Sequence, residues 1–141
     1  MDKRIIKYIH KNKVITLATS LNQQPYCANC YYAFDEKNGR LIFLSDEQTR
    51  HIQEALKNDL VAGTITTDHL SVAKIKGIQF TGKFMVPNED LKKDFYALYY
   101  DRFPFAKAKP AAIWGIALEF VKMTDNTLGF GTKISWEKGN D

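Results

Sequence analysis

Short apolar segments rich in β-branched and aromatic residues recur along this chain, and turn signals separate them. The clearest example is Leu41 to Leu44, which follows Asn38-Gly39. Because Asn-Gly readily adopts the left-handed conformations of a tight turn, Tyr26 to Phe34 and Leu41 to Leu44 are predicted to form a β-hairpin. Segments of this length are typical of strands in an antiparallel sheet.

Four further segments have the same strand-like character. Gly77 and Gly82 interrupt the segment Ile75 to Val86, which indicates bulges or close backbone approach there. A polar loop around Asp68-His69 is expected to hold a short extra strand at Leu70 to Ala73, and the tail from Thr124 is expected to be a loop. The four segments are Val14 to Ser20, Leu60 to Thr66, Ile75 to Val86 and Ala111 to Lys122.

Three segments have helical periodicity. Asp2 to Lys11 carries Ile5, Ile6 and Ile9 on one face. Ser45 followed by Gln48 matches a capping box, which predicts a helix from Ser45 to about Asn58. Asn88 is expected to cap a third helix, which Pro104 ends.

Six short strands joined by hairpins, with three interspersed helices, predict an α+β fold. The expected architecture is an antiparallel β-barrel of Greek-key type with flanking helices. The chain has 141 residues, of which 45% are hydrophobic. This is the usual size of one domain, so residues 1–141 are predicted to form a single domain.

Composition narrows the location and the partners. No apolar run approaches the roughly 20 residues of a membrane helix, and the N-terminus lacks the apolar core of a signal peptide. A cytoplasmic protein without membrane contact is expected. The net charge of +4 is spread along the chain without a dense basic tract. It favours small anionic ligands about as much as nucleic acid. Nine Phe and seven Tyr residues are compatible with base stacking, but most alternate as core residues do, so nucleic acid is not the predicted partner.

Cys27 and Cys30 form a C-x-x-C pair, which could be a redox pair or half of a zinc site. Residues three apart in a strand point to opposite faces, so the two sulfur atoms should diverge. No second ligand pair completes four zinc ligands. Two packed thiols and no metal site are therefore predicted.

A candidate anion site lies where the third strand meets the second helix. Ser45 and Thr49 are four residues apart and Arg50 follows, so two hydroxyls and a guanidinium can converge near free helix N–H groups. This combination suits a phosphate. The alternative is that Ser45 only caps the helix and Arg50 is a surface charge.

The segment Leu41 to His51 resembles the strand-to-helix segment of the pyridoxamine 5'-phosphate oxidase-like, FMN-binding split-barrel family. That family has a pattern of the form F-x-T-x-x-x-S-R-K. Phe43, Ser45, Thr49, Arg50 and His51 occupy its places without a gap, and the order of elements agrees along most of the chain. Thr124 to Gly131, with Arg102-Phe103-Pro104 earlier, is similar to the YhbP-like branch of this family.

The resemblance implies a six-stranded split barrel that forms a homodimer with FMN between the subunits. Ser45, Thr49 and Arg50 would hold the phosphate, and His51 would stand where many relatives have a second cation. The strand segment Asn29 to Tyr32, with Asn29, Tyr31 and Tyr32, would flank the isoalloxazine. Gln79 would offer a polar side chain to the ring, and Lys133 and Trp136 could reach the cofactor from the other subunit.

Two departures argue against pyridoxamine oxidase activity itself. Cys27 and Tyr32 replace basic residues of the oxidase, and no Arg follows Arg102. The prediction is a flavin-dependent oxidoreductase on an unidentified small substrate, with no catalytic residue assigned. The alternative is a non-catalytic split barrel that binds haem or another flavin, as a sensor or carrier. With His51 beside Arg50, flavin binding should weaken between about pH 6 and about pH 8.

Overall fold

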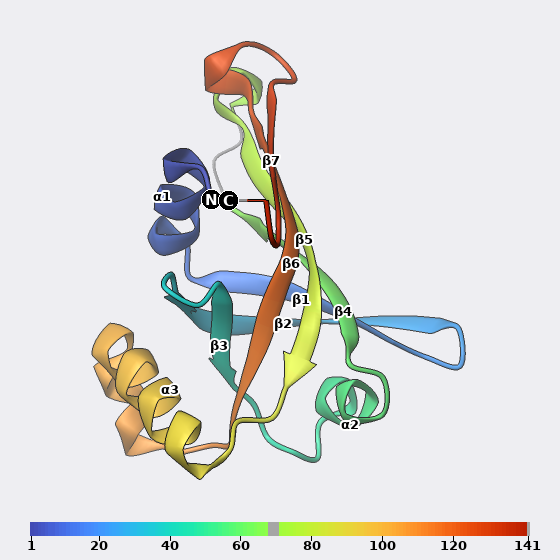
Figure 1. Ribbon diagram of the computed structural model, residues 1–141, viewed down its shortest axis with the longest axis vertical. Coiled ribbons are helices and arrows are strands. Elements are labelled where there is room, and N and C mark those ends of the chain that lie inside the picture. The colour runs from blue at the N-terminus through green and yellow to red at the C-terminus, as the bar shows by residue number, and fades with distance from the viewer. Residues whose placement is uncertain (68–70, 141) are drawn as a thin grey trace.

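The computed structural model describes residues 1–67 and 71–140. These residues form three α-helices, three short 3₁₀ helices and seven β-strands (Figure 1). The α-helices are α1 (Lys3–Lys11), α2 (Arg50–Lys57) and α3 (Glu89–Arg102), and the 3₁₀ helices are η1 (Val72–Lys74), η2 (Pro104–Ala108) and η3 (Asn126–Leu128). The strands are β1 (Val14–Leu21), β2 (Gln24–Asp35), β3 (Arg40–Leu44), β4 (Leu60–Thr66), β5 (Lys76–Met85), β6 (Ile113–Asp125) and β7 (Lys133–Glu137).

The seven strands form one antiparallel sheet that closes on itself. Their order is β3-β2-β1-β4-β5-β6-β7, and an additional pairing between β3 and β6 closes the ring. Strands β1, β2 and β3 are joined by hairpins and β4 returns to lie beside β1, which is a Greek-key arrangement. The predicted α+β split barrel with flanking helices is confirmed. Strand β7 is a seventh strand, added to β6 in the tail for which a loop was predicted.

The barrel is split along one side of β2. Its pairing with β3 starts at Asp35 opposite Arg40 and ends at Tyr32 opposite Phe43. Beyond that point, residues 25–31 of β2 pair with β1 alone in the described part of the chain. This stretch of β2 therefore has an edge whose backbone N–H and C=O groups are not paired with a second strand.

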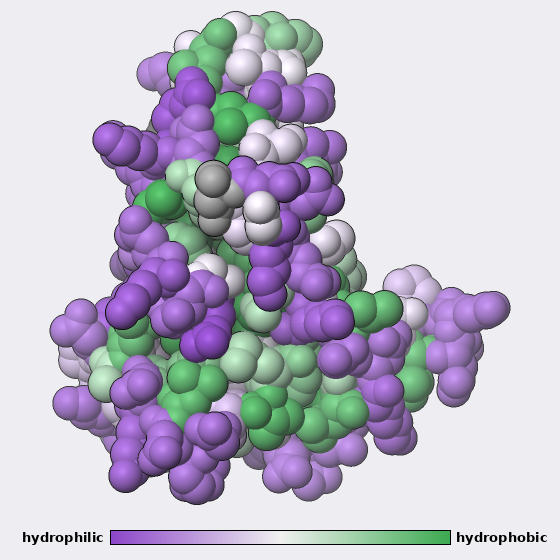
Figure 2. All heavy atoms as spheres, in the orientation of Figure 1, coloured by the Kyte–Doolittle hydropathy of each residue, from purple (hydrophilic) through white to green (hydrophobic). Residues whose placement is uncertain are grey.

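Two groups of buried side chains hold the elements together. The larger group fills the barrel and includes Leu17, Phe43 and Ile116, each fully buried. The smaller group joins α3 to the outside of β2 and β3 through Phe95 and Tyr99. In Figure 1, α3 and α2 lie at the lower end, with α2 beneath the protruding β1–β2 hairpin, while α1 lies higher beside the barrel. Figure 2 shows polar side chains over much of this face and apolar ones gathered toward its lower end.

Local signals placed several boundaries correctly. Asn88 caps α3 by accepting a hydrogen bond from the Leu91 N–H, and Asp2 caps α1 in the same manner through the Arg4 N–H. The predicted irregularity at Gly82 is a register shift between Thr81 and Gly82. A Cβ at Gly82 would lie 2.6 Å from the Ala117 carbonyl oxygen, so the close backbone approach requires glycine there.

The predicted start of the second helix is wrong. Helix α2 begins at Arg50, and its N-cap is Thr49 rather than Ser45. Ser45 is held in the chain leaving β3, because its N–H donates to the Ala112 carbonyl and its own carbonyl accepts from the Trp114 indole. These contacts with the segment around β6 outweigh the local capping preference of Ser45. Asp46 instead turns the chain, accepting from the Gln48 N–H.

The predicted extra strand is also wrong where it can be compared with the structure. Val72–Lys74 forms the 3₁₀ helix η1, while Leu70, with Asp68 and His69, lies outside the described residues. The Asn126 side chain holds η1 in this place by donating to the Val72 carbonyl.

Candidate functional site

Three polar side chains converge at the end of β3. The Ser45 hydroxyl is hydrogen-bonded to Nε2 of His51 at 2.7 Å, and it lies 3.5 Å from the Thr49 hydroxyl. The Thr49 hydroxyl is in turn 3.4 Å from the same His51 nitrogen. We call Ser45, Thr49 and His51 the hydroxyl–imidazole cluster. Its members were predicted from sequence, and the structure brings them together.

The N-terminus of α2 opens beside this cluster without a side-chain cap. The Thr49 hydroxyl donates to the Asp46 carbonyl at 2.8 Å and caps no N–H of the helix. The first N–H bonded within this turn is that of Gln53, which donates to the Thr49 carbonyl. The N–H groups of the first turn are therefore available donors, and they carry the positive end of the helix dipole.

Arg50 lies at this helix start but is not a free surface charge. Its Nε donates to Oε2 of Glu54 at 2.8 Å, and its guanidinium lies 4.1 Å from the centre of the Tyr26 ring. Stacking on the ring and a bond to Nε fix the plane of the guanidinium. The two terminal nitrogens remain as donors for an anion.

Glu54 is the buried counterpart of Arg50. The residue is only 7% exposed, and Thr19, itself 2% exposed, donates its hydroxyl to Oε1 at 2.8 Å. Hydrogen bonds from Arg50 and then from Thr19 hold the pKa of Glu54 below its ordinary value. A charged carboxylate with both oxygens engaged is a stable anchor for the guanidinium.

The His51 imidazole is partly buried under the helix start. Loss of solvent lowers the pKa of His51. The ring is therefore neutral at neutral pH, and it can either donate to or accept from the Ser45 hydroxyl. An anion bound at the cluster would favour the charged ring and draw a proton to it.

Side chains of β2 lie on two different faces. Asn29 and Tyr31 point outward, and Asn29 accepts a hydrogen bond from the Thr16 hydroxyl. Tyr31 is 54% exposed and packs edge-on against Phe103. Tyr32, by contrast, is fully buried, and its hydroxyl donates to the Ile9 carbonyl at 2.6 Å. The prediction that Tyr32 flanks a cofactor is wrong for its side chain, because strand alternation turns it into the core.

Gln79 and Lys133 lie on the sheet but apart from the cluster. Gln79 is exposed on the same outward face of the sheet as Asn29. The two residues belong to one row of cross-strand partners, Asn29, Thr16, Thr64 and Gln79, so they lie three strand spacings apart, which is roughly 14 Å. Lys133 is at the start of β7 and contacts the Gly131 carbonyl at 3.3 Å. Within one chain the structure does not join Lys133 to the hydroxyl–imidazole cluster.

The two cysteine side chains diverge, as predicted, but the prediction that both thiols are packed is wrong for Cys27, because strand alternation turns it to the surface. Cys27 is exposed and Cys30 is buried, and both are free thiols. Burial raises the pKa of the Cys30 thiol to about 11. Among the described residues, no three His, Cys, Asp or Glu side chains are grouped so that they could hold a metal ion.

Sequence reasoning missed three residues that shape the site. Glu54 follows Arg50 by four positions, a helical spacing from which the ion pair could have been found. Thr19 and Tyr26 come from the β1–β2 hairpin, far from α2 in sequence, and no local pattern connects them to it.

No helix among the described residues is both long and apolar enough to cross a membrane.

Solved structures with the same fold include a haem-binding protein and a FAD-binding protein. A haem-binding protein from Mycobacterium smegmatis has a TM-score of 0.77 at 16% identity, over 92% of this chain and 55% of that longer one. A FAD-binding protein from Mesorhizobium loti has a TM-score of 0.70 at 18% identity, over 87% of this chain and 94% of the other. A protein from Clostridium acetobutylicum that is related to general stress protein 26 of Bacillus subtilis, of the pyridoxinephosphate oxidase family, has a TM-score of 0.68 at 12% identity, over 96% of this chain and 92% of the other. At sequence identities of 12% to 18%, the likeness to these structures establishes the fold alone.

Sequence relatives are much closer. No family model matches the chain. A UPF0306 protein from Serratia proteamaculans is 38% identical over 137 residues, covering 97% of this chain and 95% of the relative. A UPF0306 protein from Yersinia pseudotuberculosis is 37% identical over 134 residues, covering 95% and 91%. With identity of this level along nearly the whole of both chains, this protein belongs to the UPF0306 family.

Proposed function

We propose that this protein binds FMN and acts as a flavin-dependent oxidoreductase on a small substrate. The observation that carries the proposal is the uncapped N-terminus of α2, flanked by the hydroxyl–imidazole cluster and by Arg50. Free N–H groups, the Ser45 hydroxyl and a fixed guanidinium are the kinds of donor that a phosphate monoester requires. The FAD-binding and pyridoxinephosphate oxidase-family proteins that share the fold support a flavin as the ligand.

The residues present fit the phosphate end of FMN. Ser45 would donate its hydroxyl, and Thr49 would do so only on releasing the Asp46 carbonyl. Arg50 would present its two terminal nitrogens while Glu54 retains Nε. His51 would contribute a hydrogen bond and, once protonated, a second positive charge. When bound, the flavin supplies the electron-transfer chemistry, and the protein supplies position and hydrogen bonds.

The unpaired edge of β2 is the proposed place for the flavin ring. Residues 25–31 lack a second strand partner in the described chain, and Tyr26 at one end of this edge supports Arg50. From Tyr26 to Tyr31 the edge is roughly 17 Å long, enough for an extended mononucleotide. Backbone N–H and C=O groups here can bond to the polar rim of the ring, with Asn29 and Tyr31 alongside.

We propose a homodimer with the cofactor at the subunit interface. The outward row of Asn29, Thr16, Thr64 and Gln79 consists of small and medium polar side chains that another copy could approach closely. Lys133 and Gln79, which do not meet the hydroxyl–imidazole cluster of their own chain, would approach the cofactor of the partner chain. The cytoplasm is the proposed compartment, since Cys27 and Cys30 are both free thiols.

Pyridoxamine oxidase activity is not proposed. The two positions on β2 where that enzyme has basic residues hold Cys27 and Tyr32, of which Tyr32 is buried. No Arg follows Arg102 to bind the substrate phosphate. The substrate is therefore expected to be a different small molecule.

The test is a titration of the protein with FMN, followed by flavin fluorescence, beside Arg50→Ala. Loss of the guanidinium should weaken binding by about tenfold or more, because a charge-assisted phosphate contact is removed. Lys57→Ala is the matched control, since it removes an exposed cation from the other end of α2. Saturable binding that weakens only in Arg50→Ala supports the proposal. Equal binding by Arg50→Ala, or no binding by the natural protein, refutes it.

A haem-binding role is the second candidate, because a haem-binding protein shares the fold with a TM-score of 0.77. Titration with haemin should then produce a Soret band, and that band should persist in Arg50→Ala. A flavin ligand would instead give absorption near about 450 nm.

A further inference from the structure

A second cleft lies between α1 and the strands it covers, and it shares no described lining residue with the hydroxyl–imidazole cluster. Its volume is about 470 Å³, which is within the usual range for small-molecule sites. We call it the α1 cleft. Its lining includes five cationic side chains: Arg4, Lys7 and Lys11 of α1, Lys74 of η1 and Lys76 of β5.

The sequence of α1 explains one wall of the cleft. Ile5 and Ile9 bury themselves in the barrel core, which fixes the rotation of the helix. Arg4, Lys7 and Lys11 are then spaced by three and four residues, so they lie along one flank. Because the core residues determine this rotation, the three cations must face the cleft.

The charges in the cleft are only partly compensated. Arg4 is paired with Asp2 at 2.9 Å, whereas Lys7, Lys11 and Lys74 form no ion pair with any carboxylate of the described residues. Like charges that line one cleft repel, so this arrangement costs free energy in the absence of an anion. An anion between the walls would remove that repulsion.

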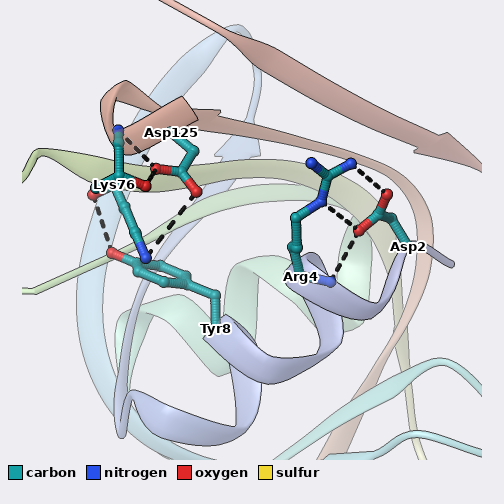
Figure 3. Close-up of polar contacts among 6 residues, drawn as sticks. Asp2, Arg4, Tyr8, Lys76 and Asp125 are labelled. Carbon is teal, nitrogen blue, oxygen red and sulfur yellow. Dashed lines mark hydrogen bonds and ion pairs between the residues drawn. The ribbon is translucent and has the colours of Figure 1, made fainter. Parts of the chain in front are cut away.

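The floor of the cleft has a different chemistry. Met123 is buried there, and the Tyr8 hydroxyl donates to the Lys76 carbonyl at 2.9 Å. Asp125 accepts at Oδ1 from the N–H and hydroxyl of Thr127, while Oδ2 has Lys76 at 3.9 Å, beyond hydrogen-bonding distance. Figure 3 shows Tyr8, Lys76 and Asp125 together, with the Arg4–Asp2 pair at the start of α1. Oδ2 therefore retains capacity to accept from a ligand hydroxyl or amine.

We propose that the α1 cleft binds a small phosphorylated metabolite of about the size of a nucleoside diphosphate. Its phosphates would lie between Lys7 and Lys11 on one wall and Lys74 on the other. Lysine is a compact charge suited to phosphate oxygens, and cations on two walls match a ligand with two or more charges. The uncharged part would lie on Tyr8 and Met123, with a hydroxyl directed to Asp125. This site is separate from the proposed flavin site and does not depend on it.

The experiment is isothermal titration calorimetry with ADP, beside pyrophosphate and adenosine as partial ligands. ADP should bind more tightly than either, because only ADP offers both the charged and the uncharged part. In Lys7→Gln/Lys11→Gln, ADP binding should weaken by about tenfold or more. Glutamine has nearly the helix propensity of lysine, so α1 remains folded.

Lys3→Gln/Lys93→Gln is the matched control. It removes two exposed lysines, one from α1 and one from α3, outside the cleft lining. Its ADP affinity should stay within about twofold of the natural protein. Equal weakening of ADP binding in both double variants would show that the effect comes from net charge alone, and it would overturn the proposal.

Lys74→Gln tests the contribution of η1 to the cleft independently of α1. It should also weaken ADP binding, by roughly severalfold. No measurable ADP binding by the natural protein overturns the proposal. ADP binding that FMN displaces and that Arg50→Ala abolishes also overturns it, since the ligand then occupies the α2 site. A flavin titration that fails while ADP binds to the α1 cleft would refute the flavin proposal alone.

Discussion

Nε of Arg50 lies 2.8 Å from Oε2 of Glu54, and this bond orients the guanidinium at the start of α2. The carboxylate is buried beneath the β1–β2 hairpin, where Thr19 holds its other oxygen. The guanidinium also stacks on Tyr26. A chain of contacts from the hairpin through Glu54 thus determines where the terminal nitrogens of Arg50 point.

Glu54→Ala should weaken FMN binding by about tenfold, because Arg50 loses the acceptor that fixes its plane. Glu54→Gln should keep the affinity within a few-fold, since the amide oxygen can still accept from Arg50 and the amide nitrogen can donate to Thr19. Flavin fluorescence titration of both variants measures the difference. Tighter binding by Glu54→Ala would show that Glu54 neutralises Arg50 rather than orienting it.

Acid should remove the stabilising contribution of Glu54. Its folded-state pKa is depressed, so the contribution is complete above its ordinary pKa of 4.5 and is lost as the pH falls through the folded-state pKa. The difference in free energy of unfolding between the natural protein and Glu54→Gln should therefore shrink from about pH 7 to about pH 3. Urea unfolding across this range measures it. Glu89→Gln, at an exposed carboxylate, is the control and should show little difference at any pH. A gap that stays constant for Glu54→Gln would contradict the prediction.

FMN binding should weaken as the pH rises from about 6 to about 8, because the phosphate favours the charged form of His51. Desolvation lowers the pKa of His51 in the free protein, and a bound phosphate should raise it, so binding takes up a proton. His51→Gln keeps a hydrogen-bonding side chain without the titration. It should retain only the pH dependence of the phosphate itself, whose second pKa is about 6. Superimposable pH profiles for the two proteins would exclude a role for His51 protonation.

Gly63→Ala should destabilise the fold by about 3 kcal/mol. A Cβ at Gly63 would overlap the Thr16 carbonyl oxygen and the Phe80 ring inside the barrel. Gly77→Ala is the matched control, because its Cβ would meet nothing nearer than the Ile65 carbonyl oxygen at 3.9 Å. Thermal unfolding of the two variants tests the close packing of β4 on β1 and β5. Similar midpoints for both would refute that packing.

Thiol labelling of the folded protein should modify Cys27 and spare Cys30. Cys27 is exposed, whereas burial raises the pKa of Cys30 to about 11 and excludes the reagent. Mass spectrometry after mild labelling should find one adduct in the natural protein and none in Cys27→Ser. Labelling in urea should then modify both thiols. Rapid modification of Cys30 under native conditions would place β2 differently from the structure.

Much of the fold could be predicted because its signals act between neighbouring residues. Asn38-Gly39 specifies the β2–β3 turn, Asn88 caps α3, and Pro104 follows its end. Ser45, Thr49 and Arg50 were predicted to converge because they are close in sequence, and the family resemblance added His51. The predicted start of α2 at Ser45 failed because remote contacts with Ala112 and Trp114 hold that residue extended.

The sequence by itself determined the α+β class and most strands and helices, since backbone conformation depends on local chemistry. It also indicated the members of the hydroxyl–imidazole cluster, but contacts with Ala112 and Trp114 hold Ser45 in its place there. Only the tertiary structure decided that β3 closes on β6 and that Glu54 meets Thr19. It alone also brought Lys74 into the same cleft as the α1 cations. The physical reason is that contacts between remote segments depend on how the whole core packs, which no short stretch of sequence encodes.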